Sequence, residues 1–168
     1  MSAAAGSVDT TEFNRFASAD AASRPVFVYG TLKRGYPNYR AYLASATYLG
    51  DARTLDPYPL VIGGRYRTPF LFDEPGRGAR VDGELFEVTS RQRARLDLLE
   101  RVGRPRGYHI AIIPVEAADG SIVDAQCYLM DRANVAIIHE ELGRTYPIDN
   151  GYVPIWKRIW ARTRLKRG

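Results

Sequence analysis

Short apolar runs, most of them bounded by glycine, proline or aspartate, make up the dominant pattern along the chain. Runs of this length with turn residues at their ends are typical of β-strands. The last two runs flank an Asp119-Gly120 turn, which indicates a hairpin. The pattern predicts strands over residues 25–29, 58–62, 70–72, 81–88, 108–115 and 122–130.

Three other segments carry apolar residues at helical spacing. We predict helices over residues 39–48, 91–101 and 134–143, with Ser90 as the N-cap of the second helix and Gly143 ending the third. Few helices inserted among many short strands predict an α+β fold. We expect a mixed sheet, partly closed into a barrel, that curls around a central pocket.

The length of the chain and the composition of its ends indicate one domain with two flanking segments. The 168 residues fit a single domain that can bury its own core. The N-terminal residues are small and polar, and they lack the basic start and apolar stretch of a secretory signal. We therefore expect a mobile extension over residues 1–24, a domain over 25–150 and a basic tail over 151–168.

Two features predict a soluble, cytoplasmic protein. No apolar run approaches the ~20 residues that a membrane-spanning helix needs. The single cysteine, Cys127, cannot form a disulfide within the chain, which fits a reducing compartment.

Two histidines and this cysteine are too few for a zinc site of histidine and cysteine ligands. No spacing of carboxylates suggests another site, so we expect neither a metal nor a cofactor.

The positive charge of the chain lies in its tail. The net charge is +5, and the last twelve residues hold six basic and no acidic side chains, so the rest carries −1. Such a tail can bind nucleic acid or an anionic surface. The alternative is a solvated helix whose apolar side docks on the core, because Ile155, Trp156, Ile159 and Trp160 recur at helical spacing. We favour this alternative and expect no nucleic-acid partner.

Glycines punctuate the segment that follows the first predicted strand. Gly30 and Gly35 have the spacing of a phosphate-binding P-loop, but Tyr36 and Pro37 stand where that loop needs a lysine and a hydroxyl residue. We therefore expect no nucleotide site. A glycine after a buried strand either makes a turn or lets a ligand approach backbone N–H groups. The loop alone favours the turn.

The second predicted helix places a carboxylate beside its apolar face. Leu96 and Leu99 share that face, and Glu100 lies next to it. Partial burial would raise the pKa of this carboxyl group and suit it to proton transfer. The alternative is a salt bridge at the rim with Arg101 or Arg104, and spacing alone favours the salt bridge.

The remaining polar candidates are interpreted as structural. Asp97 lies further round the helix, within reach of Arg93 and Arg101, and is predicted to form a surface ion pair. His109 lies on a predicted strand with no catalytic motif around it. Cys127 also lies in a predicted strand, where a buried, inert thiol is expected.

Five segments, in order along the chain, carry a family resemblance. They are Val26 to Gly35 with Pro37-Asn38, Thr54 to Ile62, Val81 to Val88, Leu96-Asp-x-x-Glu100 with Tyr108, and Gln126-Cys-Tyr128. Together they span roughly residues 25–130 and resemble the γ-glutamylamine cyclotransferases, within the γ-glutamylcyclotransferase-like or AIG2-like family. The combination of the first and fourth motifs at this separation is fairly specific.

The resemblance implies a set of site residues. It implies that Glu100 is the catalytic glutamate, which reverses the preference for a salt bridge. Met130 stands where an aromatic residue is expected, so one wall of the pocket differs. The residues that fall on the substrate-binding positions are Tyr29, Gly30, Thr31, Leu32 and Tyr108.

The resemblance also implies a reaction. An enzyme of this family releases 5-oxoproline and a free amine from a small-molecule γ-glutamyl amide, by attack of the glutamyl α-amine on its own γ-carbonyl, with no metal or cofactor. Two alternatives remain open: another γ-glutamyl substrate, such as a dipeptide or a biosynthetic intermediate, or a non-catalytic binding protein. Residues 155–168 lie outside the resemblance, so we expect them to be dispensable for catalysis.

Overall fold

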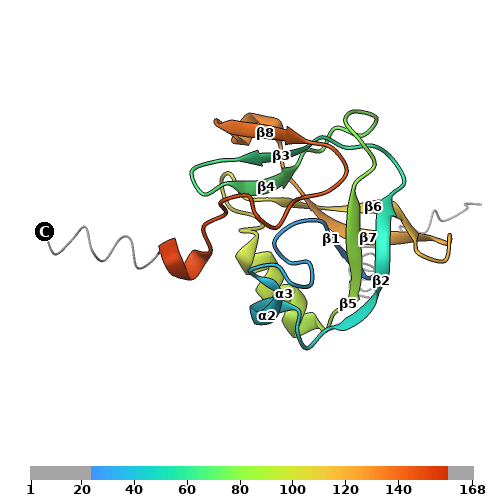
Figure 1. The fold of residues 1–168 in the computed structure, drawn as a ribbon. Coiled ribbons are helices and arrows are strands. Elements are labelled where there is room, and N and C mark those ends of the chain that lie inside the picture. The colour runs from blue at the N-terminus through green and yellow to red at the C-terminus, as the bar shows by residue number, and fades with distance from the viewer. Residues whose placement is uncertain (1–23, 159–168) are drawn as a thin grey trace, which may run out of the picture.

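The computed structural model describes residues 24–158. At its centre is a closed barrel with the strand order β1-β5-β2-β6-β7 (Figure 1). Neighbouring strands are antiparallel, except that β1 pairs in parallel with β7. The prediction of an α+β fold with a mixed, closed sheet is confirmed. The barrel strands are β1 (Val26–Val28), β2 (Thr47–Thr54), β5 (Asp82–Glu87), β6 (His109–Ala117) and β7 (Ile122–Leu129).

A second, three-stranded sheet lies against the barrel, with the order β4-β3-β8 (Figure 1). It is joined to the barrel strand β7 just beyond its end, where Met130 N–H donates to the Leu71 carbonyl at 2.9 Å. An isolated bridge between Phe72 and Met130 continues this link. The strands of this sheet are β3 (Leu60–Gly63), β4 (Thr68–Leu71) and β8 (Ile138–Leu142).

The main helix, α3 (Ser90–Leu99), begins one residue earlier than its predicted cap implies. Thr89, not Ser90, is the N-cap, since the Thr89 hydroxyl accepts a hydrogen bond from the Gln92 N–H at 3.2 Å. The Gln92 side chain in turn accepts from the Thr89 N–H at 2.8 Å. This reciprocal capping box stabilises the first turn of the helix.

Two predicted helices are wrong in whole or in part. The helix expected over residues 39–48 is only the single turn α2 (Tyr39–Tyr42), and β2 begins at Thr47 and pairs with β5. The helix expected over residues 134–143 is instead the short 3₁₀ turn η1 (Arg132–Asn134) followed by β8. In both places the backbone pairs with a strand distant in sequence, and that pairing outweighs a weak local periodicity.

The core has three clusters of buried residues, and two of them share the short strand β1. Phe27 belongs to the cluster inside the barrel, together with Leu85 and Leu129. Its neighbours Val26 and Val28 point the other way, into the cluster that α2 and α3 cover. Because consecutive side chains of a strand alternate between faces, this one strand anchors the barrel interior and the helix layer. The loop that leaves β1 is therefore held firmly at its start.

The chain after β8 crosses back over the fold. Tyr146 is fully buried in the barrel cluster, and the Val153 N–H donates to the Tyr66 carbonyl at 3.1 Å. Residues 155–158 are helical, as predicted, but Trp156 is 59% exposed, so its expected docking on the core is wrong. Ile159 and Trp160 lie outside the described residues. Within residues 24–158, no helix has the length and apolar character required to cross a membrane.

Candidate active site

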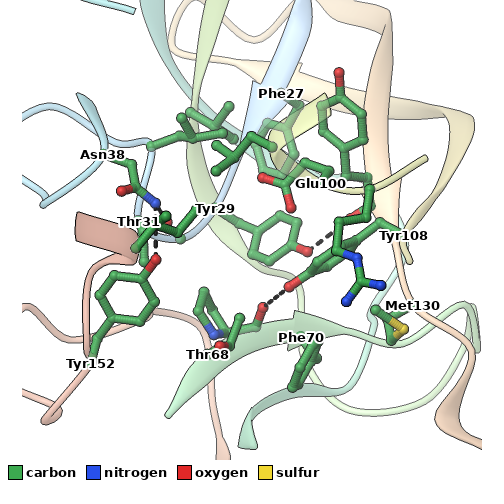
Figure 2. Close-up of a pocket in the computed structure, with 18 of the residues that line it drawn as sticks. Phe27, Tyr29, Thr31, Asn38, Thr68, Phe70, Glu100, Tyr108, Met130 and Tyr152 are labelled. Carbon is green, nitrogen blue, oxygen red and sulfur yellow. Dashed lines mark hydrogen bonds between the residues drawn. The ribbon is translucent and has the colours of Figure 1, made fainter. Parts of the chain in front are cut away.

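A pocket of about 200 Å³ opens where five parts of the chain meet (Figure 2). These parts are β1 with the loop after it, the C-terminal end of α3 with the residues that follow it, the strand β4, the C-terminal end of β7 and the segment after residue 150. Its size suits a small molecule. All six residues that were predicted to form the site line it: Tyr29, Gly30, Thr31, Leu32, Glu100 and Tyr108.

The loop after β1 is fixed against β4 and against its own end. A Cβ atom at Gly30 would lie 2.6 Å from the Pro69 Cγ atom, so this close approach requires glycine. The Thr31 carbonyl accepts from the Asn38 N–H at 2.9 Å, and the Thr31 hydroxyl accepts from the Asn38 side chain at 2.9 Å. The loop is therefore rigid where it borders the pocket.

Three backbone N–H groups of this loop have no hydrogen-bond acceptor within residues 24–158. Those of Gly30, Thr31 and Leu32 donate to no other residue in the part of the chain that the structure describes. All three residues are buried and line the pocket. Buried N–H groups are almost always paired, so these donors indicate a place for an oxygen atom of a ligand. Adjacent N–H groups suit an anionic oxygen in particular.

Glu100 follows α3 directly, as its C-cap residue. Figure 2 shows its carboxyl group next to the Tyr29 ring. Burial raises the pKa of this carboxyl group to about 8, and none of the described cations lies within ion-pairing distance of it. The alternative of a rim salt bridge with Arg101 or Arg104 is therefore absent from residues 24–158. A carboxyl group with this pKa can both accept and donate a proton near neutral pH.

Two tyrosines form the floor beside Glu100. The Tyr29 hydroxyl donates to the Tyr128 carbonyl at 2.8 Å, and the Tyr108 hydroxyl donates to the Pro69 carbonyl at 2.6 Å (Figure 2). Burial raises the pKa of both phenols well above the usual value, so both stay neutral. Each tyrosine hydroxyl donates its proton to a backbone carbonyl of another segment. The two side chains therefore line the pocket and also hold these segments together.

Asp97 does not form the surface ion pair that was predicted. Its carboxylate accepts a hydrogen bond from the Tyr128 hydroxyl at 2.6 Å, and Tyr128 lines the pocket. Arg93, one of the expected partners, instead donates to the Gln126 side chain. The helical spacing predicted a surface position for Asp97, whereas the packing of β7 against α3 brings the Tyr128 hydroxyl to its carboxylate.

The far wall of the pocket is apolar. Phe70 stacks on Tyr108 with ring centroids 5.7 Å apart. Met130 is almost fully buried and also lines the pocket, as Figure 2 shows, so the expected departure from an aromatic residue does fall on the pocket wall.

The segment after residue 150 is the part of the site that the sequence reasoning missed. The Tyr152 hydroxyl accepts a hydrogen bond at 3.0 Å from the Asn38 side chain, which also holds Thr31. Ile155 and Arg158 line the pocket as well. This removes the reason for expecting residues 155–158 to be dispensable. No local signal could have found them, because 114 positions separate Asn38 from Tyr152.

Other reactive side chains lie away from the pocket. Burial raises the pKa of the Cys127 thiol, which lies inside the barrel cluster. His109 pairs with Asp73 at 2.9 Å. Among the described residues, no three His, Cys, Asp or Glu side chains come together as candidate metal ligands.

Residues 26–151 match the model of the family described as gamma-glutamyl cyclotransferase, AIG2-like. The chain belongs to this family. It is 52% identical over 80 residues to the gamma-glutamylaminecyclotransferase of Bos taurus, covering 45% of this chain and 48% of that protein. It is 38% identical over 121 residues to the protein of the same name from Homo sapiens, covering 64% of this chain and 78% of that protein.

The coverage of these relatives is uneven. The matches with the bovine protein and with a Danio rerio relative span about half the length of each relative. The fold agrees over a longer stretch. The crystal structure of an AIG2-like protein from Mus musculus covers 76% of this chain and 97% of its own, with 31% identity and a TM-score of 0.58.

Proposed function

We propose that this protein is a γ-glutamylamine cyclotransferase, which converts a γ-glutamyl amide into 5-oxoproline and a free amine. One observation carries the proposal. The pocket combines two features. The desolvated Glu100 carboxyl group has no cationic partner among the described residues, and neither do the N–H groups of the loop at Gly30, Thr31 and Leu32 have an acceptor there. A ring closure that moves protons and develops one oxyanion needs these two features. The relatives named for this activity support the choice of substrate class.

The reaction joins two atoms of the same molecule. The glutamyl α-nitrogen attacks the γ-carbonyl carbon, the carbon–nitrogen bond to the leaving amine breaks, and the five-membered lactam remains. Because the attack is intramolecular, a pocket that holds the glutamyl chain folded removes much of the entropic barrier, ~7–11 kcal/mol at best. The rigid loop after β1 and the walls at Tyr29 and Tyr108 are suited to that task.

Glu100 would move the proton. A free α-amino group has a pKa of about 8, so it is largely an ammonium ion at neutral pH and cannot attack. A carboxyl group with a pKa of about 8 exchanges a proton with it at little cost in free energy. In our proposal Glu100 takes one proton from the ammonium group and gives it to the leaving nitrogen. The second proton, which the ring nitrogen loses as the lactam forms, passes through Glu100 to the released amine, which departs as an ammonium ion.

The N–H groups of the loop would bind an oxygen of the substrate. They can hold the developing oxyanion of the tetrahedral intermediate, or they can hold the α-carboxylate of the glutamyl group. Both roles place the glutamyl part of the substrate at this loop. The expected partner is thus a small γ-glutamyl molecule. A cytoplasmic location and the lack of a nucleic-acid partner stay predictions from the sequence.

The test is release of 5-oxoproline from a panel of γ-glutamyl amides, dipeptides and biosynthetic-type intermediates. Glu100→Gln keeps the size of the side chain but removes the base, and we expect the rate to fall about 10²–10⁴-fold. Binding of 5-oxoproline should persist, because the loop is unchanged. Glu140→Gln is the matched control, since Glu140 is exposed on β8 and lies outside the pocket.

The outcomes separate the alternatives. Equal turnover by wild type and Glu100→Gln would show that Glu100 is not the proton carrier. If the protein released 5-oxoproline only from the dipeptides or the intermediates, it would be a cyclotransferase for that other class of γ-glutamyl substrate. A wild-type protein that binds 5-oxoproline but turns over none of the panel would instead be a binding protein.

A further inference from the structure

A second pocket, of about 540 Å³, lies where β2, β5 and the turn between β6 and β7 meet, and it shares no lining residue with the pocket of Glu100. Three small residues line it: Ala52, Gly83 and Ala117, which are register partners across neighbouring strands. They face the barrel interior, because Ala52 belongs to the barrel cluster and a Cβ atom at Gly83 would lie 2.5 Å from the Phe27 ring. Small side chains at this level of the barrel leave room for a ligand.

The charged residues of the same strands point the other way. Along each strand they alternate with the three small residues, so their side chains leave the outer face of the barrel wall. Each carboxylate among them has an arginine partner. The pairs are Arg53 with Asp82, Arg80 with Glu116, and Arg34 with both Glu84 and Asp51. The negative charge around the pocket is therefore compensated.

Lys33, at the end of the loop after β1, brings an ammonium group to this pocket. The residue is 7% exposed and lines the pocket. Its Nζ atom donates to the Tyr146 carbonyl at 3.4 Å and lies 4.5 Å from the centre of the Tyr36 ring. Both tyrosines belong to the barrel cluster or pack against it, so the ammonium group points inward. No carboxylate within residues 24–158 lies within ion-pairing distance of it.

A buried ammonium group with donors to spare indicates an anionic ligand. Of its three N–H donors, one has an acceptor among the described residues. Burial lowers the pKa of Lys33, and attraction to Glu84, Asp82 and Asp51 offsets this only in part. A buried charge is costly unless it is paired. The partner that would complete the pocket is one negative charge, since the nearby carboxylates already face arginines.

We propose that this pocket binds a small carboxylic acid, with the carboxylate on the Lys33 ammonium group and a short apolar chain along Ala52, Gly83 and Ala117. One ammonium group balances the single charge of a carboxylate. Phosphate carries more than one negative charge at neutral pH, and the carboxylates around the pocket would repel the excess. The site lies outside the pocket of Glu100 and does not depend on the proposed function.

Butyrate and inorganic phosphate are the probes, titrated into uniformly ¹⁵N-labelled protein at pH 7. We expect butyrate to shift the amide signals of the three small residues along one saturating curve, and phosphate to bind more weakly. Lys33→Met keeps the length of the side chain but removes the charge, and it should weaken butyrate binding at least about tenfold. The signals of Thr68 and Phe70 report separately on the pocket of Glu100, which both residues line.

Lys157→Met is the matched control, because Lys157 also lies over an aromatic ring, that of Trp156 at 5.2 Å, but is exposed and outside both pockets. It should bind butyrate like wild type. Ala117→Leu fills the pocket from β6 and leaves the charge in place, and it should also block binding. Melting temperatures would show that each variant folds, and an apolar side chain in place of a buried charge is not expected to destabilise the protein.

Four results would overturn the proposal. Shifts confined to Thr68 and Phe70 would place the butyrate in the pocket of Glu100 instead. Unchanged affinity in Lys33→Met or in Ala117→Leu would mean that butyrate binds elsewhere. Tighter binding of phosphate than of butyrate would assign the pocket to a more highly charged anion. Shifts that do not saturate at millimolar butyrate would mean that Lys33 has no carboxylate ligand.

Discussion

At the scale of single residues, Glu100 owes the raised pKa of its carboxyl group to burial, since no cation among residues 24–158 lies within ion-pairing distance of it. Desolvation alone raises the pKa of its carboxyl group to about 8. The neighbouring tyrosines stay neutral, because burial raises the pKa of each phenol and each hydroxyl donates to a carbonyl. A proton can therefore move between Glu100 and a bound amine without competition from these side chains.

This arrangement predicts a pH profile. In the reactive complex, one of the two groups is protonated and the other is not: either the Glu100 carboxylate faces the substrate ammonium group, or the Glu100 carboxylic acid faces the neutral amine. Below pH 8 both groups are protonated and one proton must leave, and above pH 8 both groups lose their protons. We expect kcat/KM to rise from pH 6 to a maximum near pH 8 and to fall at higher pH, measured as 5-oxoproline release. A profile that is flat from pH 5 to pH 7 would mean that the carboxyl group titrates in its ordinary range.

At the scale of elements, the loop after β1 depends on its contact with β4. Gly30 lies against Pro69, and Asn38 bonds to both the backbone and the hydroxyl of Thr31. These contacts join the loop to β4 and to its own end, and they hold the N–H groups that lack a described partner at one edge of the pocket. In our proposal, the position of β4 thus decides where an oxygen atom of the substrate binds.

Gly30→Ala should disturb this edge. The added methyl group would lie 2.6 Å from Pro69 Cγ, so the loop or β4 must shift, at a cost of about 1–3 kcal/mol. We expect a lower melting temperature. We also expect kcat/KM to fall by more than the loss of folded protein would explain. Gly143→Ala is the control, since nothing lies within 4 Å of its added Cβ and its backbone needs no glycine. If Gly30→Ala retained full turnover, the loop would have no part in binding the oxyanion.

At the scale of the whole molecule, the barrel, the second sheet and the returning C-terminal segment enclose the pocket together. Asn38 joins the loop to Tyr152, and the Tyr36 hydroxyl donates to the Tyr146 carbonyl at 2.7 Å across 110 positions of sequence. The C-terminal segment is therefore one wall of the pocket, and the charge that its arginine brings is part of the site.

Two truncations separate the wall from the basic end of the chain. Removal of residues 152–168 deletes Tyr152, Ile155 and Arg158 from the pocket lining, so we expect turnover of γ-glutamyl-ε-lysine to fall at least about tenfold, the loss of one charged contact. Removal of residues 159–168 alone should preserve turnover, in line with the prediction that the basic charge is dispensable. Circular dichroism and melting temperature would confirm that both truncated proteins fold. Equal activity of the two would mean that the wall is not needed.

The sequence by itself determined most of the strands and the helix α3, because each is specified by a local pattern of apolar and turn residues. Alternation across residues 81–88 and a Thr89-to-Gln92 capping box act within a few positions. It also identified Glu100 and five other residues that line the pocket, through motifs that resemble those of a known family. Their catalytic and binding roles stay predictions.

Only the tertiary structure decided which parts of the chain meet. It turned residues 138–142 into a strand by pairing them with β3, and it placed Asp97 under Tyr128 and Arg158 at the pocket. It also raised the pKa of the Glu100 carboxyl group and left three N–H groups of the loop without partners among the described residues. Burial, desolvation and strand pairing depend on residues far apart along the chain, so no local pattern contains them.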